Sequence, residues 1–411
     1  MMALLAGFMA YKREEVSHVP YWNVKINSSM KRYDDMPIVW KTFQEAGYVT
    51  LYAEEYLDAT FSLLDVGFLR DPVDYYWRSA YVSLKSSLGS ISNNKLRFWD
   101  RSRWRYCVGN QPSYRHMLNY TEEFLAEMGD LRYFALSFFV EMSHEYLTDV
   151  KNMDNDLVEF FTRMYDGGKF NNTVVLVMGD HGHRFDDIRS TFIGRIEERM
   201  PFLGISLPET LLKTYPHLQK GLNHHTERLL SWYDIHELLV DLAEDDLGEK
   251  PKKFRPHAVG KSILRPFDDN RTCSQIGILP EYCMCDREAQ IPSDSEKAKI
   301  SAETAIAHIN LLLEDSDRYV KYGETRRCAS LALAHISSAT LSMRNFSSGK
   351  SSLLIRVIFQ VYPSMGMFEA AVEHGPGVPP TVMGDINRIN KYGIQPSCIS
   401  HDILRLYCFC L

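Results

Sequence analysis

The sequence predicts an α/β protein whose core is a mainly parallel sheet with helices on both faces. Segments with helical spacing of apolar residues alternate along residues 34–248 with short, uninterrupted apolar runs. Such runs are typical of strands buried on both faces, and their alternation with helices indicates a parallel sheet. Beyond about residue 295 the pattern changes, and we expect a smaller, mainly β C-terminal region.

The first expected helix covers 34–46, with Pro37 in its first turn and Gly47 as its stop, and a strand follows at 48–53. The later elements are, in order, a helix over 113–129, a strand over 133–142, a helix over 149–165, strands over 174–178 and 199–208, and a helix over 227–248. Ligand sites in parallel sheets lie beyond the carboxyl ends of the strands. We therefore expect 142–144 and 179–183 to lie at such an edge.

A domain boundary is predicted near residue 295, within "QIPSDSEKAK". It separates a core over 1–295 from a cysteine-containing region over 296–411. Three later stretches have the alternation of antiparallel strands: "AIAHINLLLED", "LALAHISSATLSM" and "SLLIRVIFQVYP".

Composition excludes several classes of protein. The 411 residues carry a net charge of -7 with basic residues scattered among acids, which argues against nucleic-acid binding. No segment reaches the roughly 18 uninterrupted apolar residues of a membrane helix, so no transmembrane segment is expected. The apolar start "MMALLAGFMAY" is a poor signal peptide and is interpreted as the interior of a fold.

Cysteines and glycosylation sequons favour an extracellular or secretory location. The eight cysteines gather late in the chain, and their two C-x-C pairs lack zinc-ribbon spacing, so disulfides are favoured over metal. A weaker alternative is a zinc-structured module built from Cys283, Cys285, Cys408 and Cys410. Five N-x-[ST] sequons predict a glycoprotein: Asn27, Asn119, Asn171, Asn270 and Asn345.

The stretch "VVLVMGDHGHRF" combines an apolar strand with a polar cluster. Asp180 and His181 follow the strand, and Gly179 and Gly182 permit a tight backbone around them. Carboxylate and imidazole together suit zinc or manganese, and the carboxylate also suits calcium or magnesium. The alternative is an ordinary polar turn after a core strand.

Several ordered blocks over roughly residues 3–290 resemble a known family. They are "VVLVMGDHGHRF" with "IRSTFIGRIEERMPFLGISLP", "DDMPIVWKTFQEAGYVTLYAEE", "FFVEMSHEYLTDVKNMDNDL", "LLSWYDIHELLVDL" and "RTCSQIGILPEYCMC". The chain resembles DUF229, a family of sulfatase-like proteins in the alkaline phosphatase-like superfamily. The resemblance implies an α/β/α sandwich core, incomplete at its N-terminus, and metal-dependent hydrolysis of a sulfate or phosphate ester. The substrate class would be a sulfated or phosphorylated small molecule or glycan.

In that superfamily a metal-bound Ser, Thr or formylglycine attacks sulfur or phosphorus. By resemblance, Asp180 and His181 map onto ligands of a divalent metal: zinc, manganese or calcium. His144 matches a position where relatives place a histidine at the metal or the substrate oxyanion; otherwise it is a loop histidine bonded to a backbone carbonyl.

Three further residues have two interpretations each. His183 and Arg184 either contact the anionic group or take part in surface ion pairs. His225, beside His224, either caps the following helix or reaches a second metal.

The superfamily's first strand, its metal-ligand Asp and its nucleophile are expected upstream of "MMALLAGF", which itself resembles the segment after the nucleophile. No later stretch replaces them, so we assign no catalytic residue and expect a catalytically incomplete fragment of a hydrolase. The alternative function is a non-catalytic extracellular protein that retains the fold for glycan or protein binding.

Overall fold

The computed structural model describes residues 33–411 apart from 57–59, 62–67, 85–106, 109, 145, 254, 256–257, 269, 346–350 and 402. The sequon at Asn27 and the side chain of Asn345 lie outside the described part. Two compact units are present. The first comprises the described residues of Lys25–Met178 with Phe202–Arg271, and the second comprises Gly179–Pro201 with Thr272–Leu411. This division differs from a single boundary near residue 295, because residues 179–201 belong to the second unit.

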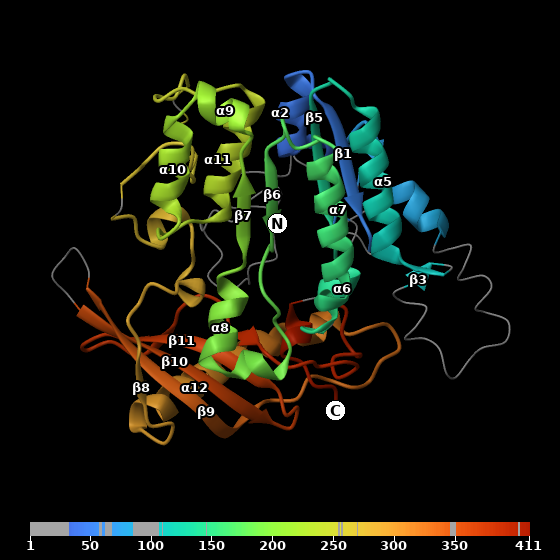
Figure 1. Ribbon diagram of the computed structural model, residues 1–411. Helices are drawn as coiled ribbons and strands as arrows, with labels where there is room; N and C mark the ends of the chain where they lie inside the picture. Colours follow the sequence, from blue (N-terminus) through green and yellow to red (C-terminus); the bar gives the residue numbers. More distant parts are fainter. Residues whose placement is uncertain are drawn as a thin grey trace. The chain divides into compact units, whose positions relative to one another are not determined.

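The first unit alternates helices and strands, as the sequence predicts (Figure 1). Its strands are β1 (Val49–Glu54), β2 (Tyr75–Tyr76), β3 (Cys107–Val108), β4 (Gln111–Pro112), β5 (Tyr133–Phe138), β6 (Val175–Met178) and β7 (Leu203–Ser206). Its helices are α2 (Val39–Glu45), α5 (Ser113–Glu127), α6 (Glu141–His144), α7 (Asp154–Asp166), α9 (Glu209–Thr214), α10 (His217–His225) and α11 (Trp232–Ala243).

The strands of the first unit form two separate main pieces of sheet. β1 pairs in parallel with β2 on one edge and with β5 on the other. β6 and β7 pair with each other in antiparallel fashion, with Val175 opposite Ser206. The prediction of parallel pairing is therefore confirmed for β1 and β5 and is wrong for the pair β6 and β7, while the short strand β2 was not predicted. The reason is that the connection between β6 and β7 folds into the second unit and supplies no crossover helix to the first.

Helices cover both faces of β1. Tyr52 points into one hydrophobic cluster, formed chiefly with α2 and α11, which we call the α2/α11 cluster. Leu51 and Ala53 point into the other, formed with α5 and α7, which we call the α5/α7 cluster. Because successive strand residues point to opposite faces, this alternation places helices on both sides of the sheet.

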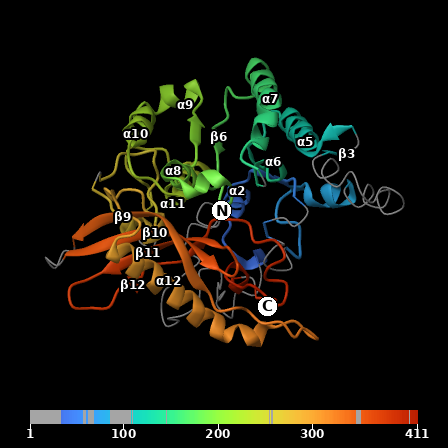
Figure 2. The same ribbon diagram turned by 90° about the horizontal axis from the view of Figure 1, so that it is seen from below.

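The second unit contains a larger antiparallel sheet, seen in two orientations in Figures 1 and 2. The strand order is β12–β11–β10–β9–β8, and β13 also pairs with β11. The expectation of a C-terminal antiparallel region is confirmed. Its elements are α8 (Phe192–Arg199), β8 (Ala289–Ile291), α12 (Glu296–Glu314), β9 (Ala332–Asn345), β10 (Ser351–Tyr362), β11 (Met367–His374), β12 (Thr381–Val382) and β13 (Asn387–Arg388).

One of the three predicted C-terminal strands is wrong. "AIAHINLLLED" lies largely within helix α12, while the other two stretches form most of β9 and β10. The buried positions of α12 recur at intervals of three to four residues and pack on the sheet: Ala298, Ala302, Ala305, Ile309 and Leu313. The hydroxyl of Ser295 caps the helix by accepting from the Ala298 amide. The helical period extends upstream of the quoted stretch, which is why local alternation misled the prediction.

Three disulfides lie in the second unit: Cys273–Cys283, Cys328–Cys408 and Cys398–Cys410. Their presence confirms the predicted disulfide bonding. Of the four cysteines in the suggested zinc module only Cys285 keeps a free thiol, so that weaker alternative is wrong. Among the described helices, none combines the length and apolar character that a membrane span requires.

A buried group of ion pairs holds α8 to the C-terminal sheet within the second unit. Glu369 on β11 accepts from Arg189 at 2.6 Å and from Arg199 at 2.7 Å. Although burial opposes ionisation, Arg199, Arg189 and Arg195 lower the pKa of Glu369 to about 2. Glu198 lies 3.0 Å from Arg189. We call the whole set the Glu369 cluster: Arg189, Arg195, Glu198, Arg199, Glu288, Arg356 and Glu369.

We predict that Glu369→Gln strongly destabilises the second unit. The substitution leaves buried guanidinium groups without their shared carboxylate, and loss of one partner from a buried ionic group costs about 3–5 kcal/mol. Urea denaturation measures the loss of stability. The control is Glu324→Gln, which removes the exposed ion pair to Arg326 and should leave the unfolding midpoint unchanged. Equal midpoints for wild type and Glu369→Gln would contradict the prediction.

Candidate functional site

The predicted metal motif forms a compact loop directly after β6. His181 donates its backbone N–H to Asp180 Oδ1 at 3.0 Å, which leaves Oδ2 facing the imidazole. The other imidazole nitrogen, Nδ1, lies 2.7 Å from the carbonyl oxygen of Gly182. A carbonyl only accepts, so Nδ1 carries the proton and Nε2 keeps its lone pair. That Nε2 atom lies 3.6 Å from Asp180 Oδ2.

This geometry suits a divalent cation. Metal-binding histidines commonly donate their second ring N–H to a carbonyl, which fixes the tautomer and orients the ring. Burial, followed by the positive charge of Arg184, lowers the pKa of the His181 imidazole, whereas Asp180 raises it. The net lowering favours the neutral form, which is the form that binds a metal. Asp180 and His181 thus fit as two of the ligands that zinc or manganese requires.

Helix α8 determines where this loop lies. The Gly182 amide donates to the carbonyl of Glu198 at 2.8 Å. A Cβ at position 182 would stand 2.1 Å from the carbonyl oxygen of Glu197, so any other residue would push the loop away from the helix. The glycine is therefore required by close packing, and α8 is in turn held by the Glu369 cluster. Residues 194–199 lie in this helix, so the strand expected over 199–208 begins only at Leu203.

His183 and Arg184 follow on the same loop. His183 is nearly buried, and its Nδ1 accepts from the Phe185 amide at 3.3 Å, so Nε2 carries the proton. The Nε2 atom is buried and has no hydrogen-bond partner among the described residues. The Arg184 guanidinium lies 5.9 Å from the Phe185 ring, and the described chain places no carboxylate within ion-pair distance of it. Both groups are donors that an oxyanion could use.

The remaining predicted residues belong to the first unit. His144 ends α6 and is exposed, with its ring 6.3 Å from that of Tyr56. His225 ends α10 and is buried; its Nε2 donates to the carbonyl of Arg265 at 2.9 Å and its ring stacks on Phe267 at 3.9 Å. These contacts favour a structural histidine at 225.

Within the described chain, no third histidine, cysteine or carboxylate joins Asp180 and His181 in a cluster that could hold a metal. The described residues do form two clusters that could hold a metal, but both consist of cysteines. Five of these six cysteines are in disulfides. The structure therefore brings Asp180 and His181 together and supplies two ligand groups. His144 and His225 belong to the first unit, whereas the motif belongs to the second.

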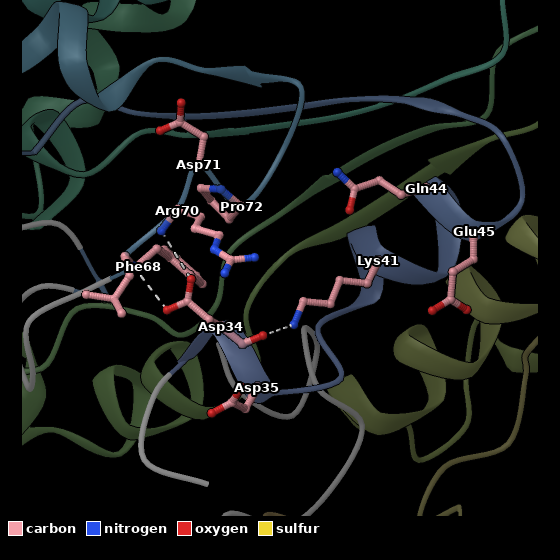
Figure 3. A pocket seen from close by; sticks show the side chains of 10 residues that line it. Asp34, Asp35, Lys41, Gln44, Glu45, Phe68, Arg70, Asp71 and Pro72 are labelled. Carbon is pink, nitrogen blue, oxygen red and sulfur yellow. Dashed lines mark hydrogen bonds between the residues drawn. The ribbon is translucent and has the colours of Figure 1, made fainter.

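A pocket lies elsewhere, in the first unit (Figure 3). It has a volume of about 720 Å³ and none of the predicted site residues lines it. Its charged groups mainly shape the local backbone. Asp34 accepts from the amides of Leu69 and Arg70, and Lys41 donates to the carbonyls of Asp34 and Met36. We interpret this pocket as a structural feature of the loop before β2.

Sequence reasoning missed a buried pair of carboxyl groups at the carboxyl ends of β1 and β5. Glu55 follows β1, and its Oε1 accepts from the amides of Val140 and Glu141 at 3.0 and 3.1 Å. Ser113 Oγ lies 3.2 Å from Glu55 Oε2 and 2.9 Å from Glu141 Oε2, so it joins the two carboxyl groups. Burial, and then the charge of Glu141, raise the pKa of Glu55 to about 8. The strand-end rule applied to Asp180 would have identified Glu55, but no motif marked it.

Comparison with known proteins identifies the family of this chain. The family described as "Protein of unknown function (DUF229)" matches residues 1–337, most of the chain. The chain belongs to the DUF229 family. No curated protein and no solved structure matches it. For this DUF229 protein, the site geometry is therefore the main guide to function.

We predict that the paired carboxyl groups make this DUF229 protein less stable as the pH rises. The pKa of Glu55 is about 8 in the fold against 4.5 for the free side chain, so the folded state holds the proton more tightly. The stabilisation is complete below pH 4.5 and is lost as pH rises through 8, a change of order a few kcal/mol.

Urea denaturation between pH 5 and pH 8.5 tests this prediction. Glu55→Gln cannot titrate but can still accept from the two amides, so its stability should vary less with pH than that of the wild type. Glu127→Gln, at an exposed position in α5, should keep the wild-type pH dependence. A Glu55→Gln profile parallel to the wild type would show that Glu55 does not titrate in this range.

Proposed function

We propose that this chain contributes the Asp180/His181 part of the metal site of an enzyme that hydrolyses a sulfuric or phosphoric ester. The observation that carries the proposal is the His181 ring, whose Nδ1 is engaged by a backbone carbonyl while Nε2 faces Asp180 Oδ2 at 3.6 Å. A polar turn without a ligand has no need of this arrangement, whereas a metal ligand does. The alkaline phosphatase-like sandwich fold belongs to the same proposal.

In the proposed reaction a bound divalent metal lowers the pKa of the attacking hydroxyl group and offsets the charge that develops on the ester oxygens. Asp180 and His181 would hold the metal through a carboxylate oxygen and the imidazole Nε2. His183 presents a buried N–H with no partner in the described chain, which suits donation to an ester oxygen. Arg184 suits the same anionic group through its planar guanidinium. The substrate class we propose is a sulfated or phosphorylated small molecule or glycan.

The proposal includes catalytic incompleteness. Two donor groups do not make a catalytic metal site, which in proteins holds at least three protein ligands around zinc. The described residues add no third ligand beside Asp180 and His181. We therefore propose that the remaining ligands and the nucleophile are not among the described residues, and that this part alone has little activity.

The same observation supports a second candidate function, a non-catalytic binding protein that retains the fold. In that case Arg184 and His183 would hold an anionic glycan or protein without cleaving it. Turnover of model esters separates the two functions, because only the hydrolase converts them.

Both proposed functions include an extracellular location for the protein. Three disulfides are typical of proteins that mature in an oxidising compartment. The sequon asparagines Asn119, Asn171 and Asn270 are exposed, so each can carry a glycan without disturbing the core.

We predict that Asp180→Ala and His181→Ala each weaken Mn²⁺ binding by at least tenfold, because each removes one of two neighbouring donors. Isothermal titration with MnCl₂ and ZnCl₂ measures the affinity. His335→Ala, which removes an exposed histidine from β9, is the matched control and should bind like the wild type.

Turnover of an aryl sulfate and of a bis-aryl phosphate, with zinc, manganese or calcium added, tests the chemistry. The 411-residue chain alone should show little turnover of either ester. Robust turnover that is lost in Asp180→Ala would show the site to be complete. Metal binding that is unchanged in both alanine variants would refute the proposed site.

A further inference from the structure

A pocket in the second unit lies where η3 (Asp187–Ser190) and the first turn of α8 meet the C-terminal sheet. Its volume is about 460 Å³, within the roughly 300–1,000 Å³ of small-molecule sites. Strands β8–β11 and the residue before β8 supply one side of the pocket, and residues 190–195 supply the other. Figures 1 and 2 both show α8 beside these strands. None of the site residues predicted from the sequence lines this pocket, so it is separate from the Asp180/His181 motif.

The two faces of the C-terminal sheet differ in chemistry. One face packs on α12 through apolar side chains such as Ala339 and Val357. Because successive strand residues point to opposite faces, their neighbours along each strand point to the other face, where the pocket lies. The strand register aligns the side chains of the pocket in two rows, Gln290, Thr340 and Arg356 in one and Ser338, Ile358 and Glu369 in the other. This side of the pocket therefore offers hydroxyl, amide, guanidinium and carboxylate groups.

The charged groups that line the pocket balance one another. Glu288 accepts from Arg195 at 2.5 Å and from Arg356 at 2.8 Å, and Glu369 is the second carboxylate. Although burial opposes ionisation, the Thr340 hydroxyl and Arg195 lower the pKa of Glu288. Two guanidinium groups thus stand with two carboxylates, and the excess guanidinium of the Glu369 cluster is among its members that do not line the pocket. Because the lining charges are paired with each other, the pocket suits a ligand without net charge.

Two buried atoms of the pocket residues lack hydrogen-bond partners. Arg195 Nε and Glu369 Oε1 have none among the described residues, although their side chains are only 5% and 3% exposed. Glu369 Oε1 lies 3.7 Å from Arg195 Nη1, which is beyond hydrogen-bond distance. A hydroxyl group donates one proton and accepts on two lone pairs, so one hydroxyl can serve an unpaired donor and an unpaired acceptor together.

An aromatic ring adds an apolar surface to these polar groups. Phe192 begins α8 and lines the pocket, yet it is 56% exposed. Ile358 supplies a second apolar side chain from the sheet. A sugar ring combines hydroxyl groups with apolar C–H groups, and the C–H groups can lie on an aromatic face. The pocket therefore matches a sugar in both its polar and its apolar groups.

We propose that this pocket binds a neutral sugar. The C–H groups of the sugar ring would lie on Phe192, and one hydroxyl would bridge the Arg195 guanidinium and Glu369 Oε1. Other hydroxyls would bond to the Gln290 amide and the Ser338 hydroxyl. The proposal rests neither on the proposed metal site nor on hydrolysis.

Saturation-transfer NMR tests the proposal with glucose, galactose, mannose and N-acetylglucosamine as probes, in EDTA so that no metal takes part. At least one of these sugars should receive saturation from the protein, and titration then gives its affinity. Phe192→Ala and Gln290→Ala should each weaken that affinity about fivefold, because each removes an exposed contact group. Tyr322→Ala removes an exposed ring that does not line the pocket, and it should bind the sugar like the wild type.

Both substituted side chains are exposed, so the variants should fold, and circular dichroism checks that they do. Failure of all four sugars to bind the wild type would overturn the proposal, as would unchanged affinity in both pocket variants. Glucuronate, the acid counterpart of glucose, should bind no more tightly than glucose; tighter binding would contradict a neutral ligand. These outcomes are independent of the Mn²⁺ titration, so the sugar pocket and the metal site can fail separately.

Discussion

The candidate site depends on the buried ion pairs around Glu369. This carboxylate binds Arg189 and Arg199, and Glu198 bonds to the same two arginines, so η3 (Asp187–Ser190) and α8 are fixed against β11. The backbone of α8 then meets Gly182 closely enough to exclude any side chain there. Asp180 and His181 take their positions from this contact. A group of charges remote in sequence therefore determines the geometry of a short polar motif.

Buried ion pairs of this kind do not by themselves make a protein more stable than an apolar core would. Their effect here is to specify one arrangement of α8 against the C-terminal sheet. Only in that arrangement do the four guanidinium groups and three carboxylates all form ion pairs. The first unit uses buried acids differently. Glu55 and Glu141 share Ser113, and burial together with the charge of Glu141 raises the pKa of Glu55 so that it holds a proton at neutral pH.

Local patterns in the sequence predicted much of the fold. Apolar runs identified β1 and β6, and helical spacing identified α5 and α11. The direction of strand pairing was harder to predict. β6 and β7 are antiparallel because the segment that connects them folds in the second unit. At the site, Asp180 and His181 were visible as a motif. The Glu369 cluster was not, since Arg189 and Glu369 stand 180 residues apart and nothing local indicates their contact.

The most direct test of this account is the Mn²⁺ affinity of Glu369→Gln, measured by titration under conditions where circular dichroism shows the variant to be folded. Glu369 is not a proposed ligand, yet it supports α8 and through it the loop. The account predicts affinity at least tenfold below wild type, approaching that of Asp180→Ala. A folded Glu369→Gln protein that binds Mn²⁺ as tightly as the wild type would contradict it, as would a wild type that does not bind the metal.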